Sequence, residues 1–133
     1  MEQFNLEIIS PEKSFLIKND ALEVVVPAIE GYMGILKDHI PIISFLKPGI
    51  IDVKLNNESL NFYVDDGVVE FKNNTLSILT SNIFDIKDIN KNNVDIIIRD
   101  AEEELKKENI KDQDRFILEK KIEVLNSLNI NLL

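Results

Sequence analysis

The spacing of the apolar residues changes near Asp85, and this change constrains the fold more than any other feature of the chain. Before Asp85, short β-branched and aromatic runs alternate with turn residues, which is typical of strands. After Asp88, the apolar residues recur with the period of a helix. The sequence therefore predicts an α+β fold. A β-sandwich of about ten short strands over residues 1–86 should precede an antiparallel two-helix hairpin over residues 87–133.

Turn signals separate the apolar runs of the first half. Residues 56–58 and 72–74 are polar and Asn-rich, and each segment lies between two short runs, as hairpin loops do. Lys47-Pro48-Gly49 is a further turn, because proline presets φ and glycine accepts a positive φ at the next position. The first half does not alternate strands with helices, so a Rossmann-type nucleotide fold is not expected.

The second half carries one apolar stripe on each predicted helix. The stripes are Val94, Ile97, Ile98, Ala101 and Leu105 in the first helix, and Leu118, Ile122, Leu125 and Leu128 in the second. Asn90 or Asn93 is the expected N-cap of the first helix. The second helix should run from Asp112 or Gln113 to near Asn126. Each helix is too short to be stable alone in water, so each must pack on a partner.

Charge and composition exclude several classes of function. The net charge is −9 and the pI is about 4.6, so the chain is repelled by nucleic acid and by anionic lipid headgroups. The sequence has no cysteine, which excludes disulfides and thiolate metal sites. We see no signal peptide and no apolar run near the roughly 18–20 residues that span a bilayer. Protein partners are therefore expected, and a membrane is reached only through them.

The single histidine, His39, lacks the partners that catalysis or metal binding requires. We therefore predict no catalytic residue and no metal site, and we expect His39 to make a loop-fixing hydrogen bond. Asp65 and Asp66 are interpreted as a hairpin turn, because adjacent strand residues point to opposite faces. Gly31 and Gly34 lack the following helix of a phosphate-binding loop. They are expected to provide a positive φ or a close backbone approach.

The segment Glu30-Gly31-Tyr32-Met33-Gly34-Ile35-Leu36-Lys37-Asp38-His39-Ile40-Pro41, followed by Lys47-Pro48-Gly49, is the most specific stretch. It resembles a segment of epsilon subunits of bacterial F-type ATP synthases, E-G-x-x-G-[IV]-[LY]-x-x-H-x-P and then K-P-G. Residues 66–71 and 76–79 also resemble strands of that family, and the match covers nearly the whole chain in order.

The resemblance implies a non-catalytic rotor subunit that couples the gamma subunit to the c-ring and inhibits ATP hydrolysis through its C-terminal helices. The implied partners are gamma, the c-ring and, transiently, the alpha and beta subunits. The implied location is peripheral, on the cytoplasmic side of the inner (plasma) membrane. The implied docking loop for the ring and gamma contains Glu30, Gly31, Tyr32, Gly34, His39 and Pro41.

In some members, the first helix binds ATP through [IL]-D-x-x-R-A. Here the spacing from Asp95 to Arg99 is four rather than three, so the motif is not met, and no cofactor is predicted. A nucleotide-sensing role for these two residues is the weaker alternative. Arg115, Lys120 and Lys121 are either regulatory contacts, as the resemblance implies, or a solvated helix face.

Two other classes of function stay open at this point. The first is a stand-alone β-sandwich binding module with a helical appendage. The second is a small hydrolase, although the chain lacks a Gly-x-Ser-x-Gly elbow.

Overall fold

The computed structural model describes residues 2–11 and 13–132, and the chain divides into two compact units. One unit ends at Ile86 and the other begins at Lys87. The strands of the first unit are β1 (Phe4–Ser10), β2 (Lys13–Ala21), β3 (Glu23–Ala28), β4 (Gly31–Ile35), β5 (Ile42–Leu46), β6 (Gly49–Lys54), β7 (Ser59–Val64), β8 (Gly67–Lys72), β9 (Thr75–Leu79) and β10 (Ile83–Asp85). A 3₁₀ turn (Ile86–Asp88) leads to α1 (Lys91–Leu105) and α2 (Asp112–Leu132). The predicted α+β class, strands first and helices second, is confirmed.

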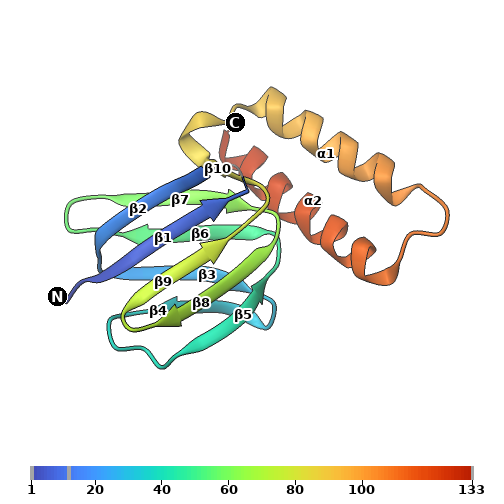
Figure 1. Cartoon of the computed structure of the whole chain (residues 1–133). Coiled ribbons are helices and arrows are strands. Elements are labelled where there is room, and N and C mark those ends of the chain that lie inside the picture. The colour runs from blue at the N-terminus through green and yellow to red at the C-terminus, as the bar shows by residue number, and fades with distance from the viewer. Residues whose placement is uncertain (1, 12, 133) are drawn as a thin grey trace. The chain divides into compact units, whose positions relative to one another are not determined.

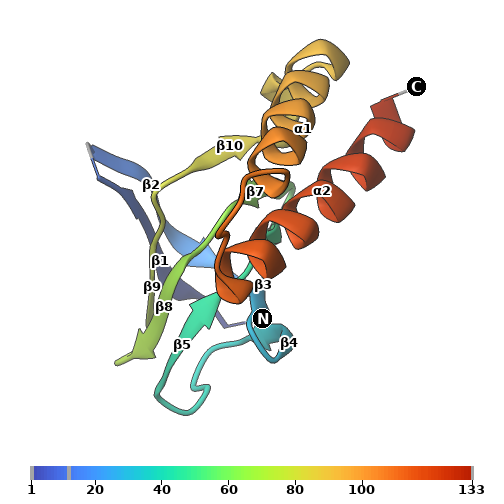
Figure 2. The ribbon, with the colours of Figure 1, turned by 90° about the vertical axis from the view of Figure 1, so that its right-hand side faces the viewer.

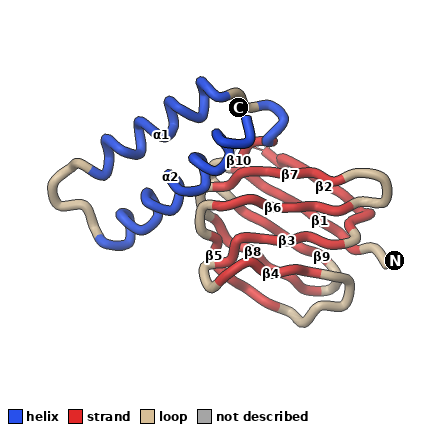
Figure 3. Tube along the Cα trace, turned by 180° about the vertical axis from the view of Figure 1, so that it is seen from behind, coloured by secondary structure: helices blue, strands red, loops and turns tan. Residues whose placement is uncertain are grey.

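The strands form one curled sheet in the order β10-β7-β6-β3-β5-β8-β9-β1-β2, with β4 paired to β3. The pairing between β1 and β9 is parallel, and the other described strand pairs are antiparallel. The sheet folds over where β3 meets β5, which are joined by the single pair Ala28–Leu46. Two layers result. Figure 1 shows β1, β9 and β8 in front of β6 and β3, and Figure 3 shows the same layers from behind.

Strand alternation fills the space between the layers with apolar side chains. In β1, Phe4, Leu6 and Ile8 are buried while the residues between them face outward. The Phe4 ring meets the edge of Phe71 at 5.7 Å between centroids, a favourable aromatic geometry. A close-packed core of this kind makes the sandwich stiff.

The hairpin turns predicted at residues 56–58 and 72–74 are present. Asp65-Asp66 is a turn but not a hairpin, because β7 pairs with β6 and β10 while β8 pairs with β5 and β9. Two glycines also act differently from the expectation. Asn73 and Asn74 alone separate β8 from β9, and both have positive φ. Gly49 does not have a positive φ. A Cβ there would lie 2.5 Å from the Cβ of Pro27, so close backbone approach explains this glycine. Gly34 needs neither explanation, because a Cβ would make an ordinary contact at 3.5 Å with Glu23. Gly31 has the expected positive φ, 141°.

The interpretation of residues 30–41 as one loop is wrong, because β4 occupies Gly31–Ile35. This segment pairs along its whole length with β3, from Ala28–Gly31 to Val24–Ile35. Its two glycines weaken the local strand signal, so the backbone pairing with β3 decides the conformation. The remaining β4–β5 loop is residues 36–41.

The helical unit agrees with the sequence at its start and differs at its end. Asn90 is the N-cap of α1, and its side chain accepts a hydrogen bond of 2.9 Å from the backbone N–H of Asn93. The α2 helix continues six residues past the predicted end at Asn126, to Leu132. Leu128 lies in this extension and is buried, so packing outweighs the weak helix propensity of the asparagines there. Figure 2 shows α1 and α2 side by side.

Candidate docking surface

The predicted docking residues fall into two groups at opposite ends of β4. Glu30, Gly31 and Tyr32 lie at the β3–β4 turn, whereas His39 and Pro41 lie in the β4–β5 loop that follows the other end of the strand. Gly34 lies within β4 itself. The sequence predicted that these residues form one contiguous loop. In the structure, strand β4 lies between the two groups and separates them.

The first group joins the predicted Lys47-Pro48-Gly49 turn. Tyr32 is 57% exposed, and its hydroxyl accepts a hydrogen bond of 3.2 Å from the backbone N–H of Ile50. The N–H of Lys47 donates to the carbonyl of Pro27 at 3.0 Å, and the N–H of Ile29 donates to the carbonyl of Phe45 at 2.9 Å. The β3–β4 turn and the β5–β6 turn therefore form one rigid end of the sandwich.

The second group is held by hydrogen bonds around His39. Its backbone N–H donates to the carbonyl of Leu36 at 3.1 Å, and Nδ1 donates to the carbonyl of Ile40 at 2.7 Å. The imidazole ring also meets the edge of Phe71 at 5.9 Å between centroids. The predicted loop-fixing hydrogen bond of His39 is thus present. Within residues 2–11 and 13–132, no cluster of three or more potential ligands could hold a metal ion.

An exposed apolar row crosses the outer face of the β5–β8–β9–β1 layer. Cross-strand pairing aligns Phe45 with Val68, Val68 with Leu79, and Leu79 with Ile9. Phe45 is 67% exposed and Leu79 is 50% exposed. We call these four residues the outer apolar row. Large exposed apolar side chains in contiguous register mark interaction surfaces.

Ile43, which is 72% exposed, extends this surface along β5. The sequence analysis missed these residues. The available signal was that Ile42–Leu46 is almost wholly apolar, so both faces of that strand must carry apolar side chains.

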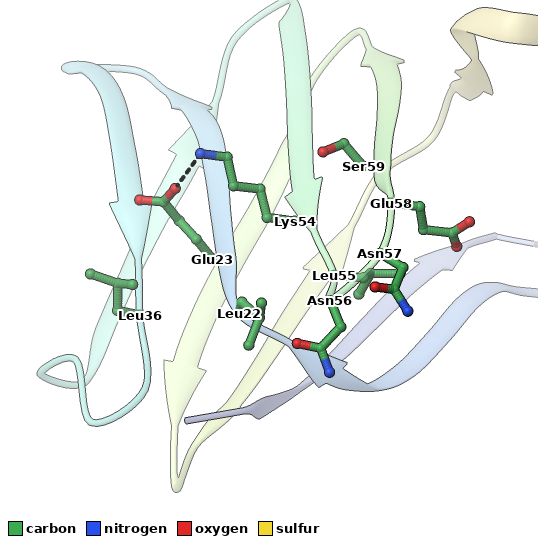
Figure 4. Close-up of a pocket in the computed structure, with 9 residues that line it drawn as sticks. All are labelled: Leu22, Glu23, Leu36, Lys54, Leu55, Asn56, Asn57, Glu58 and Ser59. Carbon is green, nitrogen blue, oxygen red and sulfur yellow. Dashed lines mark ion pairs between the residues drawn. The ribbon is translucent and has the colours of Figure 1, made fainter. Parts of the chain in front are cut away.

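The outer face of the β3–β6–β7 layer carries more polar side chains, although Val25 and Ile50 are partly exposed there. Asp52 stands between Val25 of β3 and Asn61 of β7, and Lys54 pairs with Glu23 through an ion pair of 3.5 Å. A groove of about 480 Å³ opens at the end of this layer (Figure 4). Its lining residues are Leu22, Glu23, Leu36, Lys54, Leu55, Asn56, Asn57, Glu58 and Ser59. His39 does not line the groove, so Ser59 has no imidazole base among the lining residues.

Asp95 of α1 is engaged within the helical unit. Its Oδ1 accepts a hydrogen bond of 2.6 Å from Nδ2 of Asn129 in α2, and its Oδ2 pairs with Lys91 at 3.2 Å. The Asn129 hydrogen bond, and then the Lys91 hydrogen bond, hold the pKa of the Asp95 carboxyl below its usual value. Arg99 lies one turn away and is exposed. Both carboxylate oxygens of Asp95 thus have protein partners, which leaves nucleotide sensing without support here.

The predicted basic residues of α2 differ in their surroundings. Arg115 is exposed, whereas Lys120 makes an ion pair of 3.4 Å with Glu123, and Lys121 is half-buried. Phe116, next to Arg115, is 49% exposed. None of the helices in the described residues is long and apolar enough to cross a membrane.

Sequence comparison identifies the family to which this architecture belongs. The profile described as "ATP synthase, Delta/Epsilon chain, beta-sandwich domain" matches residues 3–86, which contain all ten strands. The chain therefore belongs to the family of ATP synthase delta/epsilon chains. A chain of this family is a subunit of an ATP synthase and not its catalytic subunit. The alternatives of a stand-alone binding module and a small hydrolase are thereby set aside.

Similar curated proteins are named epsilon chains. The ATP synthase epsilon chain of Pelagibacter ubique (strain HTCC1062) is 58% identical over 128 residues, which cover 96% of this chain and 98% of the relative. That of Leptospira borgpetersenii serovar Hardjo-bovis (strain JB197) is 40% identical over 78 residues, 59% of this chain and 61% of the relative. The expected membership of the epsilon subunits is confirmed.

The fold is also found in solved ATP synthase structures. A chain of the Euglena gracilis mitochondrial ATP synthase, OSCP/F1/c-ring, gives a TM-score of 0.76 at 19% identity and covers 98% of this chain and 82% of that chain. A chain of the Tetrahymena thermophila mitochondrial ATP synthase, central stalk/c-ring, gives 0.68 at 17% identity, with coverages of 96% and 97%. At these identities the likeness concerns the fold.

Proposed function

We propose that the chain is a rotor subunit of the central stalk, which binds the gamma subunit through the outer apolar row and couples it to the c-ring. The observation that carries this proposal is the contrast between the two outer faces of the sandwich. One face exposes Phe45 and Leu79 in register, and the other exposes Asp52 and Asn61. A protein interface needs an apolar centre with aromatic residues, so the apolar face is the one expected to be covered. The similar chains come from solved assemblies titled OSCP/F1/c-ring and central stalk/c-ring, which fits a place in the stalk.

Phe45→Lys tests this proposal, with Asn61→Lys as a matched control on the opposite outer face. Both positions are exposed on strands, so neither lysine is forced into the core. Binding to purified gamma subunit from the same organism is measured by calorimetry. We expect Phe45→Lys to weaken binding roughly tenfold or more, because a charge would be buried at an interface centre. Asn61→Lys should bind like the wild type. Equal weakening by both variants would place the contact elsewhere.

For the c-ring contact, we propose the end formed by Glu30, Tyr32 and the Lys47-Pro48-Gly49 turn. This end is rigid because Tyr32 and Lys47 each make a hydrogen bond to a neighbouring strand, and rigidity lowers the entropic cost of docking. Membrane association then runs through the complex, on the cytoplasmic side of the inner membrane. Glu30→Lys should weaken the cosedimentation of the assembled stalk with purified c-ring, and unchanged cosedimentation would exclude this end.

The helical unit is proposed to regulate ATP hydrolysis by transient contact with the alpha and beta subunits. It is a separate compact unit, and it exposes Phe116 beside the cation of Arg115. An element of this kind inhibits only if it has two arrangements of similar free energy. Deleting residues 112–133 from the assembled enzyme should raise the rate of ATP hydrolysis. An unchanged rate would remove the inhibitory role and leave the rotor role intact.

A further inference from the structure

The side chain of Asn74, in the turn between β8 and β9, is hydrogen-bonded to Asp38 in the middle of the β4–β5 loop (residues 36–41). Oδ1 of Asn74 accepts a hydrogen bond of 2.7 Å from the backbone N–H of Asp38, and Nδ2 of Asn74 donates to Oδ1 of Asp38 at 3.0 Å. The two residues are 36 positions apart in the sequence. Two hydrogen bonds between the same pair of residues fix orientation as well as distance.

Asn74 is itself firmly placed. It is the second residue of the two-residue turn between β8 and β9, with φ of 53°. Its carbonyl accepts a hydrogen bond of 3.0 Å from the N–H of Asn5 at the start of β1. The anchor therefore belongs to the rigid sheet, and the loop is the element that it holds.

The anchored loop needs such support because Asp38 has a φ of 65°. A residue other than glycine in this left-handed region is held there by its surroundings. In this conformation the Asn74 side chain is hydrogen-bonded to both the backbone N–H and a carboxylate oxygen of Asp38. Without these two hydrogen bonds, Asp38 and the following His39 could adopt other backbone conformations.

The position of Asp38 determines where the loop presents its apolar side chains. Ile40 is 71% exposed and Leu36 is 47% exposed. Ile40 lies two residues before the first residue of β5, whose Ile43 and Phe45 are also exposed. The loop thus continues the surface that is proposed to bind gamma.

We propose that Asn74 is a positioning residue for docking, which holds the β4–β5 loop in the shape that meets the gamma subunit. This proposal rests on the proposed function. Both hydrogen bonds are exposed to solvent, so they contribute little to global stability. Their effect is to preorganise the loop, which lowers the entropic cost of binding.

Asn74→Gly and Asn73→Gly form a matched pair for the test. Both positions have positive φ, so glycine is tolerated at each, and the hydrogen bonds to Asp38 come from Asn74. Full-length chains are compared in gamma binding by calorimetry and in amide hydrogen exchange at Asp38 by NMR. We expect Asn74→Gly to weaken binding about tenfold and to accelerate Asp38 exchange, because an ordering cost then falls on association. Asn73→Gly should leave both unchanged.

The outcomes separate this inference from the proposed function. If the wild-type chain binds gamma and the two glycine variants bind it with equal affinity, Asn74 has no positioning role. Asn74→Asp keeps an acceptor for the Asp38 N–H. If this variant restores both Asp38 protection and affinity, the role is supported, whereas restored protection without restored affinity would contradict it. Failure of the wild-type chain to bind gamma would overturn the proposed function. Unchanged Asp38 exchange in Asn74→Gly would overturn the anchoring itself.

Discussion

Asp95 and Asn129 join α1 to α2 through a hydrogen bond of 2.6 Å between Oδ1 of Asp95 and Nδ2 of Asn129. Asp95 lies in the second turn of α1, and Asn129 lies near the end of α2. The ionised carboxylate is the better acceptor, and a charged acceptor strengthens a hydrogen bond. The closed arrangement of the hairpin should therefore depend on the charge of Asp95.

The helical unit should lose this contribution in acid. Because the pKa of Asp95 is lowered in the folded chain, its contribution is present above the unfolded value of about 3.9 and is lost as the pH falls through the folded value. Asp95→Asn removes the charge and keeps the shape. Urea unfolding followed by circular dichroism should show the wild type more stable than Asp95→Asn at neutral pH, with the two converging below about pH 4. Asp100→Asn, at an exposed position of the same helix, is the control, and a similar effect there would indicate a general charge effect.

Gly49→Ala should destabilise the sandwich by about 1–3 kcal/mol, the usual cost of overpacking. Gly49 is buried, and the new Cβ would lie 2.5 Å from the Cβ of Pro27. Gly34→Ala is the matched control in β4, because its Cβ would meet Glu23 at 3.5 Å, an ordinary contact. Urea midpoints measure both. A cost at Gly34 equal to that at Gly49 would contradict the steric explanation.

Asn90→Ala should destabilise α1 by about 0.5–2 kcal/mol, the usual cost of removing an N-cap side chain. The Asn90 side chain accepts from the N–H of Asn93 at 2.9 Å. Hydrogen exchange of the Asn93 amide should accelerate in this variant. Asn92→Ala is the control, because Asn92 is exposed within the first turn. Unchanged protection of Asn93 in Asn90→Ala would show that the cap is not formed in solution.

Local signals predicted the parts of the fold that neighbouring residues decide. The N-cap at Asn90, the Asn73-Asn74 turn and the switch from strands to helices depend on contacts within a few residues. Strand β4 was not predicted, because its conformation follows from pairing with β3. The parallel pairing of β1 with β9 joins strands about seventy residues apart, and short-range pattern carries no information on such a pairing.

The candidate site was predicted less completely than the fold for the same reason. The sequence indicated His39 and Tyr32 through a family resemblance, but it did not show that β4 separates them. The outer apolar row exists only through the registers of four strands, which bring Phe45 and Ile9 onto one face. The Asn74–Asp38 pair likewise depends on two turns meeting at one end of the sandwich.

Tyr63 is the largest of the side chains that are almost fully buried, with 1% exposure. Its hydroxyl donates to Oδ1 of Asp65 at 2.7 Å, and Oδ2 of Asp65 accepts from Asn82 at 2.8 Å. The ring stacks on Phe84 of β10 at 4.9 Å between centroids. Tyr63→Phe keeps the ring and removes the hydrogen bond to a carboxylate, so it should cost about 1–2 kcal/mol at neutral pH.

The cost of Tyr63→Phe should shrink in alkali. Burial, and then the negative charge of Asp65, raise the pKa of Tyr63 above its usual value. The folded chain therefore keeps the phenol proton when the unfolded chain loses it, near pH 10. The contribution of Tyr63 to the free energy of unfolding is therefore fully present below about pH 10 and falls as the pH rises further. Phenylalanine has no proton to lose, so the free energies of unfolding of the two chains should approach each other above pH 10. A constant difference from neutral pH to strong alkali would show that Tyr63 ionises equally in both states.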